Sequence, residues 1–238
     1  MNDRVEVDFT GSSRQVQFPL NAVFGVTTSA VTFAIKTIMP EDIQPNDGFS
    51  RTIHINAPSG CIVNPIKPAP VAGGNLETSQ RIVDSVYKAL IAAIPERLPA
   101  ASHGSMNNLM MGGVIPKTDE RWALYETIGG GYGGRFGLDG VDGVQVNMTN
   151  TMNTPIEVIE HYYPILFESY ALRSGTGGAG EWRGGVGIER SLTALAEMQV
   201  VLLGERNKIR PGDTMEACKG KRQNISFEDS MGHGCLLG

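Results

Sequence analysis

The sequence predicts an α+β fold: a mixed, strand-rich single domain with two or more helices and long loops rich in glycine and proline. The clearest helical segment, residues 75–94, carries apolar side chains at intervals of three to four residues. Shorter segments alternate in polarity or are rich in β-branched residues, which is typical of strands, at 5–9, 52–56, 122–128, 144–148 and 192–203. No repeat or low-complexity linker divides the 238 residues, which favours one domain.

Two helices are predicted with specific ends. In the first, Asn21 caps a segment that runs to Ile38 and stops at Pro40, although its β-branched residues also suit a strand. In the second, Asn75 is the N-cap, Glu77 lies in the first turn and Pro95 ends the helix.

Composition excludes several classes of protein. The net charge is −5 without a basic block, so neither a nucleic-acid partner nor an anionic membrane surface is expected. No apolar run is long enough to span a bilayer, and the first nine residues lack the features of a signal peptide. Cys61, Cys218 and Cys235 are odd in number and lack metal-ligand spacing. These features predict a cytoplasmic location.

The segment 173–190 is the most unusual part of the chain, because seven of its residues are glycine. Glycine is used where the backbone turns tightly or approaches another group closely. One interpretation is a set of tight turns between strands. The other is an anion cradle of backbone N–H groups, with charge from Arg173, Arg183 and Arg190. Both interpretations remain open from composition alone.

Two glycine motifs match G-x-G-x-x-G, one beginning at Gly129 and one at Gly175. A dinucleotide site needs this pattern to open a helix, and the residues that follow each motif are poor helix formers. We therefore reject a dinucleotide site. No Walker motif is present, so no ATP site of that type is expected on this chain.

The candidate acid–base residues are few. His54, His103, His161 and His233 form no zinc motif. Segment 157–161 comes nearest to such a motif, since Glu157 and His161 share a helical face with Glu160 to one side, but a locally packed or paired polar patch is the favoured interpretation. The thiol of Cys61 is interpreted as structural.

Several segments resemble, in order, those of the hydantoinase B/oxoprolinase family. They are Asn46-Asp-Gly-Phe, Gly60-Cys-Ile-Val-Asn-Pro65, residues 68–81, Met106-Asn-Asn108, residues 129–135, Asn153-Thr-Pro-Ile-Glu-Val-Ile-Glu160 and residues 174–187. The resemblance covers about residues 8–206 and only the C-terminal half of the family.

The resemblance implies ATP-dependent hydrolysis of a cyclic amide such as a hydantoin, N-methylhydantoin or 5-oxoproline. An A-type partner subunit would bind ATP and phosphorylate the amide, and the B-type unit would open the ring. The expected partners are this A-type hydantoinase subunit and an N-terminal B-half polypeptide in a hetero-oligomer. That second polypeptide would hold most of a divalent metal site. A related ATP-dependent ketone carboxylase and a non-catalytic assembly subunit are the alternatives.

With this chemistry in view, the predicted catalytic residues are Glu157, Glu160 and His161, where either glutamate activates water or protonates the leaving nitrogen. Charge on oxygen calls for backbone N–H groups and arginines. The predicted substrate-binding residues are Asn75, Glu77, Asn107, Arg135, Arg173, Gly177, Gly178 and Arg183. We expect residues 1–206 to form the family domain. Residues 207–238 are predicted to be a divergent tail that is disordered or serves as an assembly surface.

Overall fold

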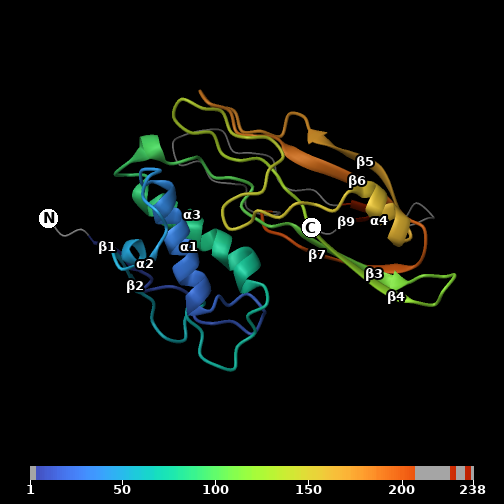
Figure 1. Ribbon diagram of the computed structural model, residues 1–238, viewed down its shortest axis with the longest axis horizontal. Helices are drawn as coiled ribbons and strands as arrows, with labels where there is room; N and C mark the ends of the chain where they lie inside the picture. The colour runs from blue at the N-terminus through green and yellow to red at the C-terminus, as the bar shows by residue number, and fades with distance from the viewer. Residues whose placement is uncertain (1–3, 207–225, 229–233, 237–238) are drawn as a thin grey trace. The chain divides into compact units, whose positions relative to one another are not determined.

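The structure is a computed structural model that describes residues 4–206, 226–228 and 234–236 (Figure 1). The α+β fold class is confirmed, with helices and strands arranged in small sheets. The chain forms two compact units, one of residues 1–98 with 147–150 and one of residues 99–146 with 151–238. None of the described helices is both long and apolar enough to cross a membrane.

The first unit packs helices beside a small parallel sheet. Strands β1 (Val5–Asp8) and β2 (Ile53–Asn56) pair in parallel, as the strand pattern at these two places predicts. Helices α1 (Phe24–Thr37) and α3 (Ser79–Leu90) lie side by side. A short helix α2 (Asp47–Ser50) and a 3-10 turn η2 (Pro95–Arg97) complete the unit. The buried apolar residues of its core include Ala30, Val31, Ala34, Ile35, Ile82, Val83 and Val86.

Asn21 does not cap α1, so that prediction is wrong. The N-cap is Val23, which has no side-chain capping bond. Asn21 is fully buried, and its amide exchanges hydrogen bonds of 2.8 Å with the backbone N–H and carbonyl of Val16. It also donates to the Pro70 carbonyl at 2.8 Å. The side chain therefore ties two loops together, because a buried amide must satisfy both its donor and its acceptor.

The start of α3 also differs from the prediction. A π-helical turn η1 (Gly74–Thr78) precedes the helix, and Asn75 lies exposed within this turn instead of capping the helix. Helix α3 ends at Leu90, before the predicted stop at Pro95. The apolar stripe identified the helix correctly, but the cap was assigned from residue type alone.

These two asparagines provide a test of stability. Asn21→Ala should lower the free energy of unfolding by about 3 kcal/mol, because it leaves several buried backbone groups without a partner. Asn75→Ala should change it by less than about 0.5 kcal/mol, since the side chain is exposed and makes no cap. Urea denaturation followed by circular dichroism measures both. Equal losses in the two variants would contradict the assignment of their roles.

The second unit is built mainly from strands. Its three-stranded antiparallel sheet has the order β4 (Arg121–Thr127), β3 (Asn108–Val114), β7 (Met198–Leu203). Strands β5 (Ile165–Arg173) and β6 (Gly187–Ala194) form an antiparallel pair, and helix α4 (Ile156–Tyr162) precedes β5. Strands β8 (Ser226–Glu228) and β9 (Gly234–Leu236) also pair.

The strand predictions for this unit are partly correct. Residues 122–128 correspond to β4, and residues 192–203 correspond to parts of β6 and β7. The strand predicted at 144–148 is wrong, because Val144 forms only an isolated bridge with Gly130. Strands β3 and β5 were not predicted; β3 contains Gly112 and Gly113, which strand propensity disfavours. The predicted tail lies largely outside the described residues, and the domain boundary at 206 stays a prediction.

One face of the three-stranded sheet is apolar and buried. Trp122 and Leu124 of β4 lie on this face and pack in one cluster with Ile159 of α4 and Ile165 of β5. Since side chains alternate along a strand, Glu126 falls on the same face as Trp122 and Leu124. The sheet therefore places a carboxylate at the end of an apolar face.

Candidate functional site

The glycine segments of the second unit are joined into what we call the glycine junction, composed of residues 129–134, 140–143 and 183–187. Backbone hydrogen bonds connect the three segments: the Gly185 N–H donates to the Tyr132 carbonyl at 2.8 Å, and the Gly140 N–H donates to the Arg183 carbonyl at 2.7 Å. The junction is thus held together by main-chain groups contributed by three separated parts of the chain.

Close packing explains why the junction needs glycine. A Cβ atom at Gly131 would lie 2.0 Å from the carbonyl oxygen of Gly185. One at Gly185 would lie 2.0 Å from the carbonyl oxygen of Val141. No side chain fits at such separations without moving the backbone. Turns and backbone packing, the first of the two interpretations, therefore account for these glycines without a bound anion.

Gly177 and Gly178 lie against the same junction. The Gly178 carbonyl accepts a hydrogen bond from the Gly184 N–H at 2.8 Å, and a Cβ at Gly177 would lie 2.3 Å from the Gly184 carbonyl oxygen. Both predicted substrate-binding glycines are thus in close contact with backbone.

Within the junction, Arg183 is held by two aspartates, Asp139 and Asp142. Its guanidinium donates to both carboxylate oxygens of Asp142, at 2.8 and 3.1 Å, and its backbone N–H donates to Asp139 at 2.8 Å. The hydrogen bond from Arg183, helped by the Val186 N–H, lowers the pKa of Asp142, and the same pair raises the pKa of Arg183. Because the pair lies at the surface, it adds little to the free energy of unfolding. Its main effect is to hold the loop at Arg183 against the loop at Asp142.

The other predicted arginines are more loosely held. Arg135 is exposed in a turn, where its backbone N–H and carbonyl bond those of Leu138. Arg173 is half-buried at the end of β5, where its carbonyl accepts a hydrogen bond from the Thr176 hydroxyl at 2.6 Å. Neither guanidinium is engaged by a carboxylate of the described residues, so both are available to an anionic ligand.

The three predicted catalytic residues lie on α4, and they differ in their surroundings. Glu157 and His161 are both exposed. Glu160 is half-buried, and one of its carboxylate oxygens accepts the backbone N–H of Phe167 at 2.8 Å. Glu160 therefore connects α4 to β5, while Glu157 keeps an open carboxylate.

The remaining predicted site residues fall in separate units. Asn75 and Glu77 belong to the first unit, with Asn75 exposed and Glu77 buried in the π-helical turn. Asn107 belongs to the second unit, is buried, and adopts a left-handed backbone conformation with φ 47°. Its side-chain amide donates to the Ile128 carbonyl at 3.2 Å.

The sequence reasoning missed a buried ion pair. Glu126 on β4 and Arg190 on β6 meet at 3.0 Å, and their side chains are only 3% and 4% exposed. Glu126 also accepts hydrogen bonds from the Asn153 amide and from the Thr154 backbone N–H. The available signal was the position of Glu126 in the alternating pattern, where an acidic residue follows Trp122 and Leu124 on the apolar face.

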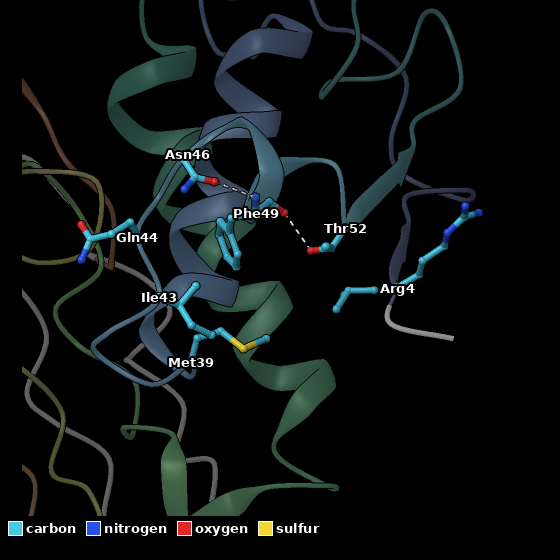
Figure 2. A pocket seen from close by; sticks show the side chains of 8 residues that line it. Arg4, Met39, Ile43, Gln44, Asn46, Phe49 and Thr52 are labelled. Carbon is cyan, nitrogen blue, oxygen red and sulfur yellow. Dashed lines mark hydrogen bonds between the residues drawn. The ribbon is translucent and has the colours of Figure 1, made fainter. Parts of the chain in front are cut away.

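The hollow of about 530 Å³ in Figure 2 lies elsewhere, in the first unit. It is lined by Arg4, Val5, Met39, Ile43, Gln44, Asn46, Phe49 and Thr52. None of these is a predicted site residue, and Arg4 is the charged group among them. This hollow therefore lacks the acid–base pairs that hydrolysis needs.

The described residues offer no cluster of metal ligands. Within residues 4–206 and the two short strands beyond, no three His, Cys, Asp or Glu side chains gather closely enough to hold a metal ion. These residues do not fit the divalent metal implied by the family resemblance, so no chemical step is assigned to one here.

The family model for hydantoinase B/oxoprolinase matches residues 1–234. The chain therefore belongs to the hydantoinase B/oxoprolinase family. It is 54% identical to an uncharacterized protein of Methanocaldococcus jannaschii, over 98% of this chain and 42% of that protein. It is 32% identical to a putative B-type subunit of a D-/L-hydantoinase from Pseudomonas sp., over 94% of this chain and 38% of that protein. The chain thus spans less than half the length of these relatives.

Two solved structures have a similar fold. The ATP-dependent caprolactamase from Pseudomonas jessenii superposes with a TM-score of 0.76 at 27% identity, over 87% of this chain and 37% of that one. Acetone carboxylase, described for ATP-dependent acetone carboxylation, gives a TM-score of 0.73 at 19% identity, over 92% of this chain and 30% of that one. The second likeness is one of fold alone.

The packing of the glycine junction leads to a second test. Gly131→Ala should lower the free energy of unfolding by more than about 3 kcal/mol, because its Cβ would overlap the Gly185 carbonyl. Gly175→Ala is the control: it has a positive φ but open space, so it should cost only about 1 kcal/mol. Chemical denaturation of the two variants compares them. A loss no larger for Gly131→Ala would show that packing does not require glycine there.

The Asp142–Arg183 pair leads to a prediction about pH. Because the pKa of Asp142 is lowered in the folded state, its contribution is complete above the ordinary value of 3.8 and is lost as the pH falls through the lower, folded pKa. The NMR shift of the Val186 amide, which donates to Asp142 at 2.8 Å, should titrate with a midpoint below 3.8. This titration should disappear in Asp142→Asn. A midpoint at or above 3.8 would contradict the pairing.

Proposed function

We propose that this chain is part of an ATP-dependent cyclic-amide hydrolase of the hydantoinase, N-methylhydantoinase or 5-oxoprolinase type, and that it acts as the B-type, ring-opening component. Its membership of the hydantoinase B/oxoprolinase family, along nearly the whole chain, carries this proposal. Similarity to a solved ATP-dependent caprolactamase, at 27% identity, supports a lactam as substrate. The likeness to acetone carboxylase is too distant to favour the carboxylase alternative.

The proposed reaction begins with an amide activated by phosphorylation on a partner subunit that binds ATP. Water adds to the activated carbon, the ring C–N bond breaks and the nitrogen takes up a proton. The resulting acyl phosphate is hydrolysed by a second water to a carboxylate and phosphate. An acid–base residue and stabilisation of charge on oxygen are therefore needed at one place.

Glu157 is the best-suited acid–base residue in this proposal. It is exposed on α4, whereas a carboxylate oxygen of Glu160 is occupied by the Phe167 N–H. We assign Glu160 to positioning α4 and His161 to a second acid–base role beside Glu157. Within the second unit, the residues proposed to contact the substrate are Asn107, Arg135, Arg173, Gly177, Gly178 and Arg183. Substrate binding by Asn75 and Glu77 of the first unit stays a prediction from the sequence.

The proposed assembly is a hetero-oligomer located in the cytoplasm. Its other members are an A-type subunit and a polypeptide with the N-terminal part of the B-type unit. The divalent metal would be held largely outside this chain. Similarity to a B-type hydantoinase component supports this arrangement, because that relative is itself named as a subunit.

Reconstitution tests the proposal. This chain should co-purify with the A-type subunit and the N-terminal B-type polypeptide of the same organism, and the complex should open a lactam ring only with ATP. Glu157→Gln should reduce the turnover number at least about 100-fold with little change in assembly, because general acid–base catalysis contributes on this scale. ATP-coupled ring opening measured by chromatography of the products gives the rate.

Glu189→Gln is the matched control, since Glu189 is an exposed glutamate on β6 outside the proposed site, and its turnover should equal that of the unaltered chain. Unchanged turnover in Glu157→Gln would remove Glu157 from the mechanism. A complex that forms normally but opens none of a panel of hydantoins and lactams would instead support the assembly-subunit alternative.

A further inference from the structure

Arg190 has an unused hydrogen-bonding edge. Its Nη1 donates to Glu126 at 3.0 Å, but its Nε and Nη2 are buried and have no acceptor among the described residues. Buried donors are nearly always satisfied, and a buried cation with one hydrogen bond is a marked exception. Nε and Nη2 of Arg190 can therefore donate to a second acceptor, which the described part of this chain does not supply.

Two aromatic rings lie against the guanidinium of Arg190. The rings of Phe167 and Tyr170 each lie with their centroids 4.8 Å from its central carbon. A cation–π contact with a ring face leaves the N–H groups in the plane of the guanidinium free to donate hydrogen bonds. A carboxylate bound at the unused edge would lie in the plane of the guanidinium.

The shape of this edge selects the ligand. Nε and Nη2 carry parallel N–H bonds, and this fork matches the two oxygens of a carboxylate. Glu126 cannot fill it, because its own oxygens already accept from Asn153 at 2.7 Å, from Thr154 at 3.1 Å and from Arg190 Nη1. A second carboxylate, from outside the chain, completes the arrangement.

Tyr170 provides a route to the edge. It lies directly opposite Arg190 in the register of β5 and β6 and is 43% exposed. Its hydroxyl has one long hydrogen bond, 3.3 Å, to the side chain of Asn153. Rotation of this side chain toward solvent would uncover that side of the guanidinium, at the cost of this hydrogen bond and of the contact between the ring and the cation.

We propose that Arg190 is a carboxylate-binding residue, and that Tyr170 covers it when no ligand is bound. The inference rests on the proposed function, in which a carboxylate occurs in two places. Opening any cyclic amide creates one on the product, and a 5-oxoproline-like substrate carries one on the intact ring. Both present the same pair of oxygens to Arg190.

Direct binding to the full 238-residue chain tests the inference and does not require turnover. The NMR signal of the Arg190 Nε–H, identified by its loss in Arg190→Lys, is followed during titration with three small molecules. They are 5-oxoproline, 4-aminobutyrate and the neutral lactam 2-pyrrolidinone. Binding of 5-oxoproline indicates a substrate carboxylate, and binding of 4-aminobutyrate indicates a product carboxylate. The neutral lactam should leave the signal unchanged.

Three variants sharpen the test. Arg190→Lys should weaken carboxylate binding at least about tenfold, because lysine lacks the two-pronged edge. Glu126→Gln should strengthen binding about tenfold, because it removes the charge that partly neutralises Arg190. Tyr170→Ala should also strengthen binding, because it removes the cover. Arg121→Lys, at an exposed arginine on the neighbouring strand β4, is the control and should bind as the unaltered chain does.

The outcomes separate this inference from the proposed function. If neither carboxylate moves the Arg190 signal in the unaltered chain, in Glu126→Gln or in Tyr170→Ala, the inference is overturned even if the complex hydrolyses lactams. If carboxylates bind as expected while the reconstituted complex opens no ring, the binding site stands and the proposed function fails. Should Arg190→Lys not fold, the other two variants still decide, because both retain Arg190.

Discussion

The second unit depends on the buried ion pair between Glu126 and Arg190. These residues come from β4 and β6, and Glu126 also holds the backbone at Thr154, just before α4. Three parts of the chain thus converge on one carboxylate inside an apolar cluster. Removing one partner of such a pair is far more costly than the pair's net contribution, since it strands a charge away from water. The ion pair therefore specifies how these elements meet more than it adds to stability.

The glycine junction connects the loops of the second unit, whereas the ion pair connects its strands and α4. It joins loops by main-chain bonds and close packing, with the Asp142–Arg183 pair fixing its surface. Apart from Arg190 and Arg183, which are proposed to bind ligands, these two features have a structural role. Together they hold the strands that flank α4, where Glu157 is exposed and Glu160 bonds β5. The proposed catalytic groups lie on a short helix that needs this external support, because seven residues form too little helix to be stable alone.

The sequence predicted what depends on local pattern. The apolar stripe of residues 82–94 identified α3, alternation in polarity identified β1, and β2 and β4 were also predicted as strands. The roles of Asn21 and Asn75 were wrong because both asparagines suit a helix cap, and only tertiary contacts decide whether the side chain caps or joins two loops. Strand β3 was missed because its pairing with two neighbours outweighs the low strand propensity of Gly112 and Gly113.

For the candidate site, too, the sequence predicts only what depends on local pattern. The candidates on α4 followed from helical spacing, which the structure reproduces. The contact between Glu126 and Arg190 joins residues 64 positions apart, so no local pattern contains it. The alternation in β4 marked Glu126 as out of place on its face, but the identity of its partner required the fold.

The contact between Gly131 and Gly185 also has a meaning for protein engineering. Since neither position accepts even a methyl group, substrate range within this scaffold must be altered elsewhere. Saturation libraries directed at Gly131 and Gly185 would consist mostly of misfolded variants. Exposed side chains around α4 and the turn at Arg135 are the positions where diversity is compatible with folding.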